Sequence, residues 1–127
     1  MKFVWKKTGD FSDSNEVIDD LSFANHVHDG LTFYAGDEFE KARKNFQIAT
    51  EMCNHDFPVI EFFTGLAFIR MHQNDSALYY FQRALEIDPM QLETRYTLYR
   101  SFMDLGRPED AAPHADVIRK IAPWLLD

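Results

Sequence analysis

The feature that most constrains this chain is an internal repeat with a period of about 34 residues. Gly30 and Gly65 match when the sequence is shifted by one period, and Ala77 and Ala111 match after the next shift. A period of this length indicates stacked copies of one small supersecondary unit, each burying its apolar face against its neighbours. The further matching positions are Phe33, Phe68 and Phe102; Ala42 and Ala77; Phe46 and Phe81; Ala49 and Ala84; and Pro89 and Pro123.

Within the second copy, the spacing of small and large residues predicts a pair of helices. Phe81 follows Ala77 by four residues and precedes Ala84 by three, which places all three on one helical face. Small residues allow two helices to approach closely, and a phenylalanine ring fills the remaining gap. Pro89 ends the second helix of the pair. The same reasoning over the chain predicts helices at 15–35, 38–53, 58–72, 75–87, 91–105 and 108–121.

The order Gly, aromatic, Ala, Phe, Ala, Pro resembles the tetratricopeptide repeat (TPR) family. The resemblance implies an all-α fold, a short right-handed α-solenoid of three TPR-like helix pairs after an N-terminal extension. The repeats are expected at 23–57, 58–91 and 92–125, and the extension at 1–22 is expected to be partly helical. The third copy departs from the pattern, with Tyr99 at the glycine position, Ala115 at the phenylalanine position and Ile118 at the second alanine position.

Charge and composition exclude several classes of partner. The formal net charge is −8, and no Lys or Arg occurs between Thr8 and Glu40, so a basic surface for nucleic acid is not expected. No apolar run approaches the ~18 residues of a membrane span, and the first residues do not form a secretory signal. Cys53 is the single cysteine, so no disulfide can form within the chain. We expect a protein of the cytoplasm.

The sequence contains no recognisable catalytic motif. It lacks a glycine-rich phosphate loop, a nucleophile elbow and a cysteine pair for zinc. His26 and His28 are too close in sequence to share one helical face, and His55 follows Cys53 in a predicted loop without a third partner. We expect no enzyme activity, no cofactor and no metal, and we interpret Cys53 as a buried thiol.

The resemblance to the TPR family implies that the first helices of the pairs line a concave groove. Some family members carry Lys and Asn in this groove to hold the terminal carboxylate of a peptide. The corresponding positions here hold Val27, Leu31, Phe63, Glu93 and Thr97, so that clamp is absent. The groove is expected to be apolar and aromatic, with arginines toward one side. The candidate groove residues are Val27, Leu31, Tyr34, Phe62, Leu66, Ile69, Arg70, Tyr96, Arg100 and Met103.

An apolar groove of this kind should be covered, because large exposed apolar patches mark interaction sites. Our leading hypothesis is a non-enzymatic protein-protein interaction module, scaffold or chaperone-like, that binds an apolar peptide or helix segment of a partner protein. One alternative is a homo-oligomeric assembly subunit, such as a homodimer, that covers its own groove and C-terminal end. Another is a chaperone similar to those of type III secretion translocators, which the architecture and groove resemble. Residues 1–8, with Phe3, Val4 and Trp5, could also cover the groove.

Overall fold

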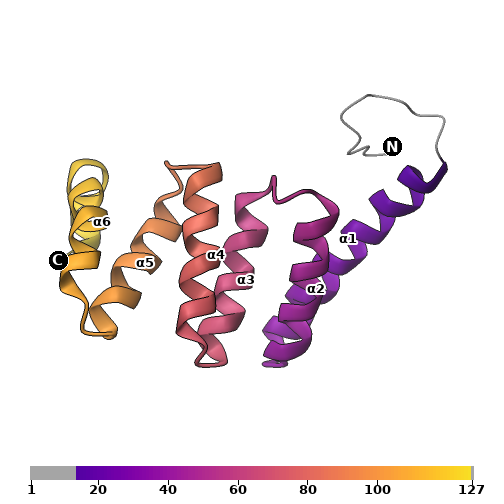
Figure 1. Ribbon diagram of the computed structural model, residues 1–127, viewed down its shortest axis with the longest axis horizontal. Helices are drawn as coiled ribbons and strands as arrows, with labels where there is room; N and C mark the ends of the chain where they lie inside the picture. The colour runs from indigo at the N-terminus through magenta and orange to yellow at the C-terminus, as the bar shows by residue number, and fades with distance from the viewer. Residues whose placement is uncertain (1–13, 127) are drawn as a thin grey trace.

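The computed structural model describes residues 14–126, and in that range six α-helices and one short 3-10 helix follow one another (Figure 1). Each helix predicted from the sequence is present, with ends that differ by at most about two residues from those predicted. The described part of the chain contains no β-strand. The helices are α1 (Ser14–Ala35), α2 (Phe39–Met52), α3 (Pro58–Arg70), α4 (Asn74–Ile87), α5 (Leu92–Asp104) and α6 (Pro108–Ile121), followed by η1 (Pro123–Leu126).

The six helices pack in three successive pairs. α1 packs on α2, α3 on α4 and α5 on α6, while α2 contacts α3 and α4 contacts α5. The pairs therefore form one row, in which the turns inside the pairs lie along one edge and the links between pairs lie along the other (Figure 1). This arrangement confirms the expected all-helical solenoid of three pairs.

The small and large residues of the repeat meet where the sequence pattern predicts. In the first pair, a Cβ atom added to Gly30 of α1 would lie 2.6 Å from Cε1 of Phe46 on α2. Ala42 and Ala49 flank that ring on α2 and are fully buried. The repeat residues are therefore packing residues that set the distance between the two helices of a pair.

The turns inside the three pairs share one backbone geometry. Asp37, His72 and Gly106 occupy equivalent repeat positions and have φ angles of 62°, 60° and 71°. In each turn the next backbone N–H donates to the carbonyl of a phenylalanine in the last turn of the first helix, as in a Schellman motif. The shared geometry gives every pair the same tight reversal. The bonds run from Glu38 to Phe33 (2.8 Å), from Gln73 to Phe68 (2.9 Å) and from Arg107 to Phe102 (2.8 Å).

Candidate functional site

The ten candidate groove residues all lie on the first helices of the pairs, α1, α3 and α5, but they differ in exposure. Leu31 is 40% exposed and Met103 is 45% exposed, and Arg70 and Arg100 are exposed as well. Phe62 is only 8% exposed. The residues of intermediate exposure are Val27, Tyr34, Leu66, Ile69 and Tyr96.

Phe62 belongs to the hydrophobic core between α3 and α4. Its ring centroid lies 5.8 Å from that of Phe81, the ring that fills the second pair. It also lies 5.8 Å from the ring centroid of Phe63, which stacks on Phe46 of the first pair. Phe62 therefore links the cores of neighbouring pairs, and little of its surface is open to a partner.

Large exposed apolar side chains of the first helices include Leu21 on α1, which is 67% exposed, and three others. Val59 on α3 is 49% exposed, and Leu31 and Met103 provide comparable exposure on α1 and α5. We call these three residues, Leu31, Val59 and Met103, the first-helix apolar set. On α5, Arg100 Nη1 donates to the hydroxyl of Tyr96 at 3.2 Å, which holds one cation beside this set. The first helix of each pair thus presents at least one large exposed apolar side chain.

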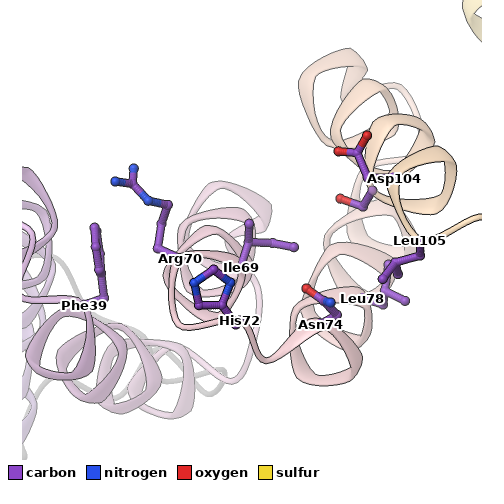
Figure 2. A pocket seen from close by; sticks show the side chains of 9 residues that line it. Phe39, Ile69, Arg70, His72, Asn74, Leu78, Asp104 and Leu105 are labelled. Atoms are coloured by element: carbon purple, nitrogen blue, oxygen red, sulfur yellow. The ribbon is translucent and has the colours of Figure 1, made fainter.

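A cleft of about 590 Å³ opens at the edge of the row where the turns inside the pairs lie, and Figure 2 shows its lining side chains. Two candidate groove residues, Ile69 and Arg70, line it. The sequence did not suggest the rest of its lining, although these side chains all sit beside the turns that the repeat phase locates. The cleft, which we call the turn-edge cleft, is lined by Phe39, Ile69, Arg70, His72, Asn74, Leu78, Ser101, Asp104 and Leu105.

Aromatic packing holds the arginine of the turn-edge cleft in place. The Arg70 guanidinium carbon lies 4.5 Å from the centroid of the Phe39 ring, at a distance suited to a cation–π contact. Tyr34 packs edge-on against the same ring, with centroids 5.3 Å apart. Arg70 Nη2 lies 3.9 Å from Oδ1 of Asp37, whose side chain is 77% exposed. This long, solvated ion pair leaves the guanidinium able to take another anionic partner.

A cluster around the buried Glu61 joins α3, α4 and the link between the first two pairs, and its presence was not predicted from the sequence. Glu61 on α3 is fully buried, and its Oε1 lies 2.5 Å from His55 Nδ1 and 3.7 Å from Arg83 Nε. Within the described residues, Glu61 Oε2 and Arg83 Nε make no hydrogen bond. Glu61 is the single charged residue in the run from Pro58 to Ile69, and this was the signal that could have revealed the cluster.

Cys53 is buried, and its surroundings do not activate it. Its Sγ lies 3.5 Å from the carbonyl oxygen of Thr50. Burial raises the pKa of the Cys53 thiol, which favours the protonated form over the nucleophilic thiolate. His55 directs Nδ1 at Glu61. Within residues 14–126, the His, Cys, Asp and Glu side chains form no group of three or more that could hold a metal ion.

Comparison with known proteins gives one informative similarity. The chain is 32% identical over 85 residues to the peroxisomal targeting signal receptor of Candida glabrata. The helix pairs fit a tetratricopeptide-like repeat. The aligned segment covers 67% of this chain and spans only 14% of the receptor. No protein-family model matches the chain.

The idea that residues 1–8 cover the groove concerns a segment outside the described residues. Among the helices that the structure describes, none is both long enough and apolar enough to cross a bilayer.

Proposed function

We propose that this chain is a non-enzymatic protein-interaction module that binds an apolar peptide or helix segment across its first helices. The observation that carries the proposal is the first-helix apolar set, in which Leu31, Val59 and Met103 are 40%, 49% and 45% exposed on α1, α3 and α5. Exposed apolar side chains on the first helices of all three pairs offer a partner several apolar contacts. The similarity to a receptor supports a role in recognition.

Half-buried aromatic side chains packed against one another would keep such a surface ordered. Tyr34 packs on Phe39 and lies 6.4 Å, centroid to centroid, from Phe63 of the next pair. Tyr96 and Tyr99 lie 6.3 Å apart on α5. Rings fixed by such contacts lose little further freedom on binding, which favours affinity. The chain would act as a scaffold or chaperone-like module according to the partner that it holds.

The test uses a peptide selected from a display library of random sequences for binding to the wild-type chain. The double variant Leu31→Ser, Val59→Ser removes exposed apolar surface, so the affinity for that peptide should fall roughly tenfold. Both side chains are substantially exposed, so the variant should remain folded.

The matched control is Ile48→Ser, which removes a side chain that is 42% exposed on α2, the second helix of its pair. Calorimetric titration of all three proteins provides the comparison. Retained affinity in the Leu31→Ser, Val59→Ser variant, or an equal loss in Ile48→Ser, would contradict binding across the first helices.

Self-assembly is a second candidate, favoured by one observation at the other end of the row. Ile121 is 42% exposed and Trp124 is 68% exposed, so α6 and η1 present apolar surface of their own. A second copy could cover this surface in a homodimer. Light scattering from micromolar to submillimolar concentration tests this, and a constant monomer mass would count against it.

A further inference from the structure

The turn-edge cleft combines an apolar floor with two opposite charges. Ile69, Leu78 and Leu105 contribute aliphatic surface from α3, α4 and the end of α5. At about 590 Å³ the cleft lies within the usual size range of binding pockets. Figure 2 shows Arg70 and Asp104 on opposite sides, with Ile69 between them.

The two charges occupy the same position of successive repeats, one period apart. Arg70 is the last residue of α3, and Asp104 is the last residue of α5. The third repeat therefore has a carboxylate at the position where the second repeat has a guanidinium. The Arg70 guanidinium carbon lies 4.5 Å from the centroid of the Phe39 ring, and the Arg70 side chain is 50% exposed. Asp104 is exposed too, one helical turn after Arg100. The repeat geometry thus produces a cleft with one cationic side and one anionic side.

We propose that the turn-edge cleft binds an extended segment of a partner protein in which an apolar side chain lies between one acidic and one basic residue. The apolar side chain would rest on Ile69, Leu78 and Leu105, the acidic side chain would meet Arg70, and the basic side chain would meet Asp104. This inference rests on the proposed function, the binding of protein segments, and specifies the charge pattern of the partner.

Charge complementarity determines the choice of occupant. A segment with two acidic residues would place one of them against Asp104, and a segment with two basic residues would place one against Arg70. A planar guanidinium fixed over an aromatic ring can form two parallel hydrogen bonds to a carboxylate, whereas a lone carboxylate such as that of Asp104 pairs readily with a lysine. Binding of a mixed pair satisfies both sides of the cleft at once.

The experiment uses four end-blocked synthetic peptides that share a Leu-Leu centre between serine spacers. One peptide is flanked by Asp and Lys, one by two Asp, one by two Lys and one by two Ser. Fluorescence anisotropy at physiological salt measures each affinity. The wild type should bind the Asp and Lys peptide roughly two- to fivefold more tightly than either like-charged peptide.

Charge reversal then tests the assignment of each side. Arg70→Glu should bind the two-Lys peptide best, and Asp104→Lys should bind the two-Asp peptide best. The double variant should again prefer the Asp and Lys peptide. The chain carries a net charge of −8, so a more negative electrostatic potential of the whole chain could by itself make Arg70→Glu prefer the two-Lys peptide. Arg119→Glu is the matched control, since that side chain is 62% exposed on α6 and does not line the cleft.

The results separate this inference from the proposed function. A peptide ranking that is the same in all variants, equal binding of the two-Ser peptide, or no binding to the wild type would overturn the inference. If the charge series fails but binding of the display-selected peptide still depends on Leu31 and Val59, the proposed function stands and only the inference about the turn-edge cleft is overturned. If the charge series holds while Leu31→Ser, Val59→Ser has no effect, the first-helix surface is the part that fails.

Discussion

Gly65 of α3 lies directly against the ring of Phe81 on α4. A Cβ atom added to Gly65 would lie 2.5 Å from Phe81 Cε1, closer than two such carbons can approach. Phe81 is fully buried, so its ring has little room to move away. In the third pair the corresponding residues are Tyr99 and Ala115, which reverse the large and the small partner. The degenerate third repeat therefore retains one bulky and one small side chain at these positions.

Gly65→Ala should destabilise the protein by about 1–3 kcal/mol, because the added methyl group forces Phe81 or the helix to shift. The control is Gly36→Ala, since a Cβ there would meet only the carbonyl oxygens of Thr32 and Phe33, at 3.6 and 3.7 Å. Urea unfolding followed by circular dichroism measures both variants. Equal stabilities for the two variants would show that the close approach at Gly65 does not limit the packing.

His72→Gly should stabilise the protein by about 0.5–1 kcal/mol. His72 has a φ angle of 60°, a conformation that costs an L-residue energy and glycine almost none. Gly106, with φ of 71° in the equivalent turn, supports the comparison, and Gly106→Ala should be destabilising although its Cβ would meet nothing within 4 Å. Thermal unfolding checks both changes, and Gln73→Gly, at φ of −103°, serves as a control that should not stabilise.

Glu61 and Arg83 should be energetically coupled. Arg83→Met leaves the buried carboxylate with His55 as its remaining close partner and should cost about 1–3 kcal/mol. In a Glu61→Gln background the same change should cost at least about 1 kcal/mol less, because no buried charge remains. A double-mutant cycle by urea unfolding gives the coupling energy. Additive effects of the two changes would mean that the ion pair contributes nothing to the packing of α3 on α4.

Stability should fall as the pH drops below about 6.5, partly through His114. Burial, and then the charge of Arg95, lowers the pKa of His114 below its usual 6.5. The unfolded chain therefore binds a proton at a pH where folded His114 stays neutral, and the free energy of unfolding decreases through this window. His114→Gln should remove this part of the pH dependence. Urea unfolding at about pH 7.5 and about pH 5.5 measures it, and identical slopes for both proteins would contradict the assignment.

The sequence was sufficient to predict the parts of the fold that repeat. Gly65, Ala77 and Phe81 recur with the period, so the helix pairs and their packing faces follow from local spacing. The burial of Phe62 could not be predicted in this way, because the tilt between neighbouring pairs decides how much of each first helix is covered. The Glu61 cluster depends on a contact between α3 and α4 at positions whose residues do not recur with the period.

The turn-edge cleft was missed for a related reason. Its lining comes from four helices and the ends of two turns, and only their relative placement creates the space. Asp104 and Arg70 hold the same repeat position, so the sequence contained the charge alternation. Without a cleft beside it, that alternation is indistinguishable from ordinary surface charge.

The most direct test of binding across the first helices is to map where a bound segment lies. Backbone amide shifts of the labelled chain would be recorded by NMR with and without the display-selected peptide. If the peptide lies on the first-helix apolar set, the largest changes will fall on α1, α3 and α5, around Leu31, Val59 and Met103. Changes concentrated on α2, α4 and α6, with the first helices unaffected, would contradict it.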